Sequence, residues 1–146
     1  MELDHKDLEL IEHAKETRRA LYRAGRHEVA SALRTQSGEV FGGVHIEANV
    51  GFADVCGEVA AICHAVAHGH GDLDTIVALG GDGPDHVYLM PPCGRCREVI
   101  SDMNPAAWVI VGTLESPYKV RVSELLPLKG VGGTDLIGGL AIVSCA

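Results

Sequence analysis

Apolar side chains recur three or four residues apart through the first part of the chain. These positions are Leu3, Leu10, Ile11, Ala14, Leu21 and Tyr22. The spacing predicts a helix over residues 5–24, with Asp4 or Asp7 available as its N-cap and Gly25 at its end. From residue 27 to residue 46 the pattern becomes partly alternating, and the turn signal Gln36-Ser37-Gly38 divides it. Two such runs around a turn predict a β-hairpin.

The second half of the chain alternates between helical and extended patterns. A nearly all-round apolar helix is predicted over 56–68, which implies burial against a sheet. A second helix is predicted over 93–103, after Pro91-Pro92. Extended runs are predicted at 73–79, 86–89, 108–111 and 119–122, followed by a last helical turn over 123–126 with Ser123 as its N-cap. This alternation predicts an α/β class, with helices sandwiching one mixed sheet.

Length and charge narrow the range of functions. The chain has 146 residues, which suits one domain over 1–146, with a core over about 8–128 and an unassigned glycine-rich tail over 130–146. A net charge of −8 would repel a phosphate backbone, so nucleic acid is not expected as a partner. No apolar run reaches the length of a membrane span, and the first residues do not resemble a signal peptide. We therefore expect a soluble, cytoplasmic protein without membrane partners.

Two segments place cysteines at the starts of predicted helices. They are Cys56-Gly57-Glu58 and Pro92-Cys93-Gly94-Arg95-Cys96. A helix N-terminus favours the thiolate, and two cysteines three residues apart share one helix face, so three thiolates can converge on one zinc ion. A structural zinc takes a fourth protein ligand, whereas a catalytic zinc leaves that position to water.

Other residues compete for the fourth position. Cys63 follows Cys56 by two helical turns, too far to share the ion, and is expected in the core. Cys145 lies in the unassigned tail and is not expected to bind. The histidines 64, 68, 70 and 86 each stay open as a fourth ligand.

Glu58 stands two residues after the first cysteine of the set. Beside an open zinc position, its carboxylate is a general base that takes a proton from water and hands it on. The alternative role is a carboxylate that favours the helix dipole near the helix start. The three cysteines favour the catalytic role.

The two cysteine motifs, in this order and each at the start of a predicted helix, resemble the signature of zinc-dependent deaminases. That signature begins with either histidine or cysteine. Because cysteine leads the first motif here, the chain resembles the cytidine deaminase family in particular. Residues 26–33, Gly38, 41–47 and 123–127 also resemble that family. The resemblance implies a three-layer α/β/α sandwich with a central mixed five-stranded sheet. It also implies a homotetrameric hydrolase of pyrimidine salvage, which binds one zinc (Zn2+) per chain and converts a cytidine-type nucleoside to the uridine-type product and ammonia.

The same resemblance implies roles for individual residues. The implied zinc ligands are Cys56, Cys93 and Cys96. Glu58 is the implied proton shuttle between water, the ring nitrogen and the departing ammonia. Backbone groups of Gly57 are implied to bind the pyrimidine edge. Glu47 matches the residue that holds the sugar 3′-hydroxyl.

Several positions depart from the family pattern. His45 stands where the family has a sugar-binding asparagine, and His27 stands where it has an aromatic residue near the base, so both belong to the expected substrate pocket. Val59 replaces an arginine that offsets charge at the zinc. The two helix N-termini supply partial positive charge in its place, and Arg95 or Arg97 is the candidate for the rest. The alternative role of both arginines is a solvated helix face.

Three alternatives stay open. This chain resembles the blasticidin S deaminases in two features, the absence of that arginine and the motif Pro-Cys-Gly-Arg-Cys-Arg. It differs from them in having Glu47, for which they have no counterpart. A nucleoside antibiotic is therefore one alternative substrate. A non-catalytic zinc-stapled binding module is a second, and it requires a fourth protein ligand. Deamination of bases in RNA or DNA is disfavoured by the acidic charge.

Overall fold

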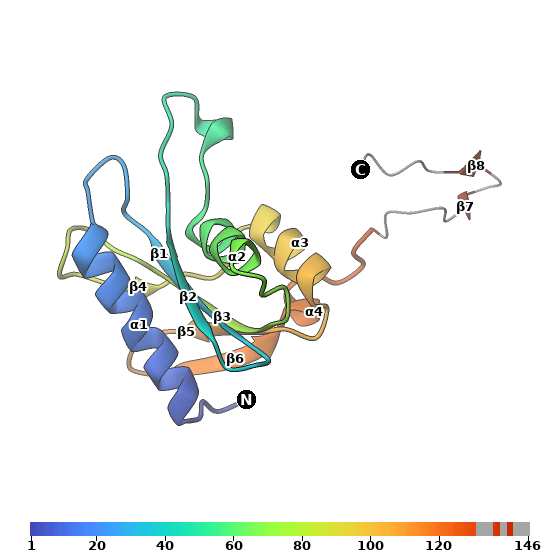
Figure 1. Cartoon of the computed structure of the whole chain (residues 1–146), viewed down its shortest axis with the longest axis horizontal. Helices are drawn as coiled ribbons and strands as arrows, with labels where there is room; N and C mark the ends of the chain where they lie inside the picture. The colour runs from blue at the N-terminus through green and yellow to red at the C-terminus, as the bar shows by residue number, and fades with distance from the viewer. Residues whose placement is uncertain (131–135, 138–139, 142–146) are drawn as a thin grey trace.

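One mixed sheet forms the centre of the molecule (Figure 1). The computed structural model describes residues 1–130, 136–137 and 140–141. The strands of the sheet are β1 (Ala30–Thr35), β2 (Val40–Val44), β3 (Leu73–Gly80), β4 (Tyr88–Leu89), β5 (Trp108–Gly112) and β6 (Pro117–Arg121). They follow the order β2-β1-β3-β5-β6, and the two-residue β4 pairs with β3 as a sixth strand. β3 and β5 are parallel, whereas the other pairs are antiparallel. The expected mixed sheet is confirmed, with β4 added to the five strands of the main path.

Helices cover both faces of this sheet. They are α1 (His5–Leu21), α2 (Gly57–Ala67), α3 (Gly94–Met103) and α4 (Val122–Leu125), and a short 3₁₀ helix, η1 (Gly51–Ala53), lies between β2 and α2. Side chains of successive strand residues point to opposite faces, and the two resulting cores are separate. In β1, Ala32 packs in the core under α1 and Leu33 in the core under α2 and α3. The expected three-layer sandwich is therefore confirmed.

The first helix is shorter than its pattern predicts. Asp4 and Asp7 form a reciprocal capping box, in which each carboxylate accepts the other residue's N–H, at 3.0 and 3.2 Å. The helix ends at Leu21 rather than at residue 24, because the chain turns there and Arg23 pairs with His27 across a tight loop. Gly25 supplies the left-handed residue of that loop, with φ at +66°.

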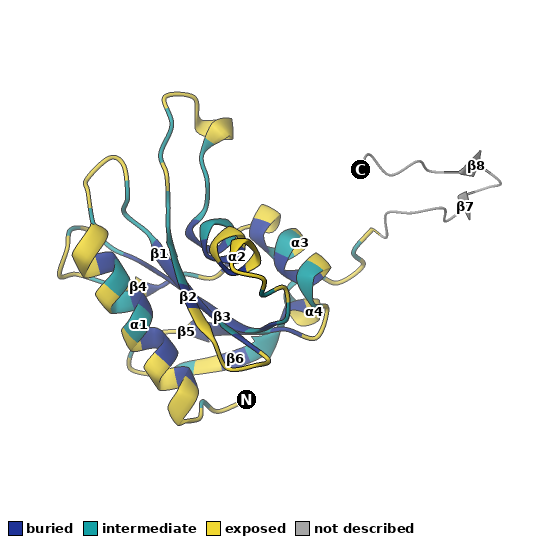
Figure 2. Ribbon diagram, viewed as in Figure 1, coloured by how far each residue is buried: buried dark blue, intermediate teal, exposed yellow. Residues whose placement is uncertain are grey.

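The second helix is buried on one side only (Figure 2). Its inward residues Ala61, Ile62 and Ala65 lie in the core, whereas Cys63 and Val66 are exposed. The expectation of a core position for Cys63 was wrong. The apolar composition suggested burial all round, but α2 covers an outer face of the sheet and needs only one buried stripe.

The end of the described chain differs in detail from the sequence prediction. The last helical turn begins at Val122, so Arg121 rather than Ser123 occupies the N-cap position, and its N–H donates to the Glu124 carboxylate at 2.8 Å.

Two short strands, β7 (Leu136–Ile137) and β8 (Leu140–Ala141), pair in the tail. Cys145 lies outside the described residues. Over the part of the chain that the structure describes, no helix has both the length and the apolar character needed to cross a bilayer.

Candidate functional site

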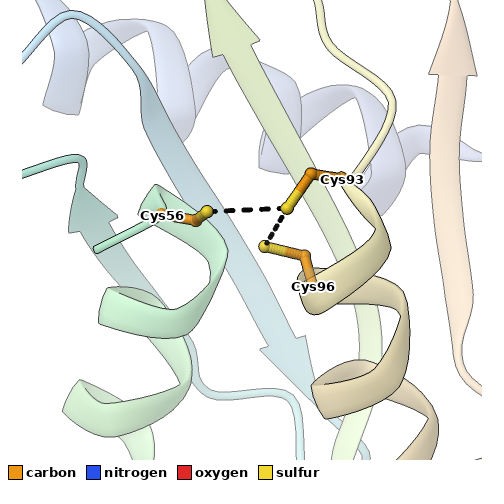
Figure 3. Close-up of side chains that lie close together, drawn as sticks. All are labelled: Cys56, Cys93 and Cys96. Carbon is orange, nitrogen blue, oxygen red and sulfur yellow. Dashed lines mark hydrogen bonds between the residues drawn. The ribbon is translucent and has the colours of Figure 1, made fainter. Parts of the chain in front are cut away.

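Three cysteine side chains meet where α2 and α3 begin (Figure 3). Cys56 is the N-cap residue of α2, Cys93 is the N-cap residue of α3, and Cys96 follows in the first turn of α3. The Sγ atom of Cys93 lies 3.6 Å from that of Cys56 and 3.6 Å from that of Cys96. The fold thus brings together the three thiols that the sequence selected, from segments 37 residues apart.

The spacing of these sulfur atoms fits a zinc ion. Zn–S bonds of about 2.3 Å in a tetrahedron place sulfur atoms about 3.8 Å apart, close to the two distances found here. All three potential ligand atoms lie within 4.8 Å of one another, and within the described ranges no fourth histidine, cysteine or carboxylate joins them. The donor set is therefore that of a zinc site with an open position.

The electrostatics of the thiols also call for a cation. Burial raises the pKa of Cys96, and the negative charges of Glu58 and Cys56 raise it further. Burial acts in the same direction on Cys93, but its hydrogen bonds with the Cys96 backbone and with the Cys96 and Cys56 thiols outweigh burial and lower the pKa of Cys93. Three thiolates so close together repel one another, and a bound divalent cation removes that repulsion by holding the coordinating thiols in the deprotonated form.

Arg95 supplies positive charge beside the cluster. Its Nη2 donates to Cys56 Sγ at 3.2 Å and to the carbonyl oxygen of Asp54 at 2.6 Å. Arg97 points elsewhere, because its guanidinium donates to the carbonyls of Pro92 and Leu125. Of the two candidates from the sequence, Arg95 therefore faces the thiols. Arg97 instead connects the start of α3 to α4 through its hydrogen bonds to Pro92 and Leu125.

Glu58 lies in the first turn of α2 and is buried, with 6% of its surface exposed. Burial raises the pKa of this carboxyl, and the hydrogen bonds from its own backbone and Cys96 and the charge of Arg95 only partly oppose that effect. A carboxyl with a raised pKa can both accept and release a proton near neutral pH, as a general acid–base group must. The position suits proton transfer beside the thiols.

A cavity of about 220 Å³ opens onto Glu58 and the thiols. It is lined by Val29, His45, Cys56, Gly57, Glu58, Ala78, Met90, Pro91 and Cys93. A larger groove of about 640 Å³ runs along the exposed side of α1, but no member of the thiol cluster lines it. The smaller cavity is therefore the candidate substrate site.

The sequence-derived substrate residues divide into two groups. His45 and Gly57 line this cavity, whereas His27 and Glu47 are not among its lining residues. The Nδ1–H of His27 donates to the carbonyl of His45, a lining residue, at 2.8 Å. The Glu47 N–H donates to the Arg26 carbonyl at 3.0 Å. The substrate roles of all four stay predictions.

Sequence reasoning missed the apolar walls of the cavity. Val29 precedes β1, Ala78 lies in β3, and Met90 and Pro91 follow β4. Pro91 was the most accessible of these from the sequence, because the Pro91-Pro92 pair directly precedes Cys93 and so had to lie near the cavity at the thiols. Ala78 and Met90 carry no local signal, because the Met90 N–H bonds to the Ala78 carbonyl only when β3 and β4 have paired.

Comparison with known proteins gives the family. The model described as the cytidine and deoxycytidylate deaminase zinc-binding region matches residues 4–112. The chain belongs to this family. Within it, the chain is 42% identical over 131 residues to blasticidin-S deaminase of Bacillus cereus, covering 87% of this chain and 94% of that protein. It is 34% identical over 122 residues to cytidine deaminase of Halalkalibacterium halodurans, covering 81% of this chain and 89% of that protein.

Solved structures of cytidine deaminases share this fold. The crystal structure of cytidine deaminase from Burkholderia pseudomallei matches with a TM-score of 0.71 and 28% sequence identity, covering 86% of this chain and 98% of that chain. The expected family and fold are confirmed. Membership of this zinc-binding family, together with the cluster of Cys56, Cys93 and Cys96, assigns the chain a zinc site.

Proposed function

We propose that this member of the deaminase family hydrolyses the exocyclic amino group of a cytidine-type nucleoside and releases ammonia and the uridine-type product. The observation that carries the proposal is the position of Glu58, buried in the wall of a cavity that also exposes two of the three clustered cysteines. A carboxyl beside an open metal position is the arrangement that hydrolytic deamination requires.

Zinc held by Cys56, Cys93 and Cys96 supplies Lewis acidity, which generates a nucleophile from water at neutral pH. The remaining steps fall to side chains of this protein. Glu58 takes a proton from the attacking water, holds it because burial raises the pKa of its carboxyl, and gives it to ring nitrogen N3. The remaining hydroxyl of that water is now bonded to C4. Glu58 then moves the proton of this hydroxyl to the amino group, so that the C4–N bond breaks, ammonia leaves and the C4 carbonyl of the product forms.

The walls of the cavity orient the ring for this transfer. Val29, Ala78, Met90 and Pro91 present apolar surface on which the pyrimidine can pack and from which water is excluded. Gly57 lies against β1, and a Cβ atom at this position would come within 3.3 Å of the Ser31 nitrogen. Glycine therefore lets the start of α2 lie close to β1. In this proposal the Gly57 backbone, which lines the cavity, meets the polar edge of the ring.

Arg95 completes the charge balance. Three thiolates around a divalent cation leave a net charge of −1, and that charge weakens the activation of water. The hydrogen bond from Arg95 to Cys56 draws electron density from this sulfur and offsets the charge. In this proposal Arg95 takes over the work of the arginine that Val59 replaces.

A nucleoside antibiotic is the second candidate substrate. The higher identity to blasticidin-S deaminase, 42% against 34% for the cytidine deaminase of Halalkalibacterium halodurans, favours it. The retained Glu47 favours an ordinary sugar. Ammonia release from cytidine, deoxycytidine, cytosine and blasticidin S separates these substrates.

The deciding experiment is the substitution Glu58→Gln. We expect the variant to bind one zinc per chain, measured by metal analysis, and to lose at least about 100-fold in ammonia release, because a general acid–base group has been removed. Glu98→Gln, an exposed glutamate on α3, is the matched control and should keep full activity. Undiminished ammonia release by Glu58→Gln would contradict the mechanism, and a fully enclosed four-ligand zinc would support a non-catalytic module instead.

We also propose a homotetramer that acts on free nucleosides in cytoplasmic pyrimidine salvage. The sequence resemblance supports the assembly, and the net charge of −8 supports a small substrate over a polynucleotide. Sedimentation of the pure protein tests the first part. Binding to labelled single strands at low salt tests the second.

A further inference from the structure

Arg18 has the largest fully buried side chain of the described residues, although it carries a charge. It lies in the last turn of α1, and 1% of its surface is exposed. Among the described residues no carboxylate oxygen lies within 4.0 Å of its guanidinium. A buried charge without a counter-ion is costly, and an apolar side chain of similar length would avoid that cost. The arginine here therefore indicates a role for the groups that it binds.

The guanidinium donates three hydrogen bonds, each to a backbone carbonyl outside α1. Nε donates to the carbonyl of Glu28 at 2.8 Å, Nη2 to that of Gly81 at 2.9 Å and Nη1 to that of Pro84 at 3.2 Å. A planar guanidinium fixes the directions of all three bonds, which a single ammonium cannot do. Arg18 therefore holds two chain segments against the end of α1. One precedes β1, and the other is the loop that joins β3 to β4 (Figure 1).

Both segments continue into apolar walls of the cavity. The Glu28 carbonyl belongs to the peptide group that joins Glu28 to Val29, a lining residue. The loop 81–87 begins where β3 ends, shortly after the lining residue Ala78, and leads through β4 to the lining residue Met90. The three bonds of the guanidinium reach neither α2 nor α3, which carry the reactive groups. Arg18 thus connects two walls of the cavity without contact to its chemistry.

The loop 81–87 depends on Arg18 for its place beside α1. Among the described residues, the hydrogen bonds that join this loop to any other segment are the two from Arg18. Because their donor is charged, these bonds are stronger than bonds between neutral groups. Without them, the loop and the peptide group before Val29 are free to move apart.

We propose that Arg18 is a positioning residue for the substrate, which holds the wall at Val29 and the wall at Met90 at the separation that a flat ring requires. This inference rests on the proposed deaminase function and extends it from the reacting groups to the part of the fold that shapes their cavity. Substrate affinity then depends on Arg18. Zinc binding and proton transfer by Glu58 do not, because α2 and α3 keep their places.

The substitution Arg18→Met removes the three bonds and keeps a side chain of similar length. In steady-state ammonia release we expect KM to rise about tenfold and kcat to stay within about twofold, because a wall supports the ring equally in the ground state and the transition state. Arg18→Lys should recover little of the affinity, since it restores the charge but not the three directed donors.

Arg19→Met, on the exposed side of the same helical turn, is the matched control and should change neither constant. An unchanged KM in Arg18→Met, or a fall in kcat without a rise in KM, would overturn the inference. Full recovery by Arg18→Lys would also overturn it, because charge alone would then be sufficient.

Hydrogen exchange of the zinc-loaded proteins gives a readout that needs no turnover. In Arg18→Met we expect faster amide exchange in the segments 27–31 and 79–90, with the starts of α2 and α3 unchanged. Metal analysis of the same preparation should give one zinc per chain. Faster exchange throughout the sheet, or loss of zinc, would show that Arg18 only stabilises the fold and would overturn the positioning role.

The two proposals fail in different ways. Locally faster exchange in Arg18→Met, without ammonia release by the parent protein from any nucleoside, would refute the function and support the role of Arg18 in shaping the cavity. Ammonia release with the same KM in the parent and in Arg18→Met would do the reverse.

Discussion

Arg95 is the side chain that brings positive charge to the three thiols, by donating a hydrogen bond to Cys56 Sγ. Its guanidinium reaches Cys56 across 39 positions of sequence, from the first turn of α3 to the start of α2. Partners of a metal ligand outside the coordination shell commonly change metal affinity or activity by about 10- to 100-fold when removed. The same range is expected here.

The substitution Arg95→Met should therefore lower ammonia release about 10- to 100-fold, because the negative charge at the thiols is no longer offset. Steady-state kinetics and metal analysis on the same preparation provide the measurement. Arg95→Lys should recover part of the activity, since it restores the charge without the planar donors. Arg19→Met, on the exposed face of α1, is the control, and equal activity of the two methionine variants would contradict the role of Arg95.

For single residues, the sequence predicts which side chains form the site better than it predicts which groups those side chains contact. The spacing of Cys56, Cys93 and Cys96 and the position of Glu58 are local patterns, so they were recognisable before the fold. The choice of Arg95 over Arg97 was not, because it depends on where α3 lies relative to the loop before Cys56. The exposure of Cys63 was missed for a related reason, since apolar composition does not reveal which side of a helix faces the sheet.

At the scale of elements, the contact between α2 and β2 positions half of the site. Gly43 in β2 lies directly under α2, and a Cβ atom there would come within 2.2 Å of the Ala61 nitrogen and 2.7 Å of the Ala60 carbonyl carbon. The glycine therefore allows the helix to lie close to the strand. Because Cys56 and Glu58 belong to the start of α2, this close approach also determines where they lie.

The substitution Gly43→Ala should force α2 away from the sheet, because the obstructing atoms are backbone. We expect a loss of about 1 to 3 kcal/mol in the free energy of unfolding, the usual cost of overpacking, together with weaker zinc binding. Urea unfolding and competition with a zinc chelator measure the two effects. Gly51→Ala, where an added Cβ atom meets nothing within 4 Å, should be neutral in both. Unchanged zinc affinity in Gly43→Ala would show that α2 is not fixed by this contact.

Most elements could be predicted from periodicity, because helices and strands of this chain have clear repeats of apolar residues. Their ends were less accessible. The end of α1 depends on the pairing of Arg23 with His27, and the sixth strand, β4, exists only because Tyr88 and Leu89 reach β3. Both are contacts between segments, which a local pattern does not contain.

At the scale of the whole molecule, a buried ionic network joins the first helix to the sheet. The Asp7 carboxylate is fully buried and accepts from Lys119 at 2.5 Å and from Arg34 at 2.9 Å. These partners belong to β6 and β1, so one carboxylate ties α1 to two strands. Burial alone would raise the pKa of Asp7, but hydrogen bonds from Lys119, the Asp4 N–H and Arg34 outweigh burial and hold the pKa below its ordinary value.

The substitution Asp7→Asn should cost about 3 to 5 kcal/mol in the free energy of unfolding at neutral pH, because it removes the buried carboxylate that pairs with both Lys119 and Arg34. Arg34 keeps its second ion pair, with Asp74 at 3.0 Å, so buried Lys119 bears most of the loss. A carboxylate whose pKa is lower in the folded than in the unfolded state stabilises the fold above about pH 4, and this stabilisation is lost as the pH falls through the folded pKa. The difference between parent and variant should thus be largest near neutrality and shrink in acid.

Urea unfolding from pH 3 to pH 7 measures this difference. Glu16→Gln, on the exposed side of α1, is the control and should stay within about 0.5 kcal/mol of the parent protein. A difference between Asp7→Asn and the parent that is independent of pH would mean that Asp7 contributes through packing rather than charge.

The placement of the reactive groups on two separate helices has a consequence for the newly made chain. Cys56 and Glu58 arrive with one helix, and Cys93 and Cys96 with another, so neither half alone can trap an ion tightly or activate water. Hydrolytic power appears only when the central strands between them have assembled. An unfinished molecule is consequently inert toward the nucleosides around it.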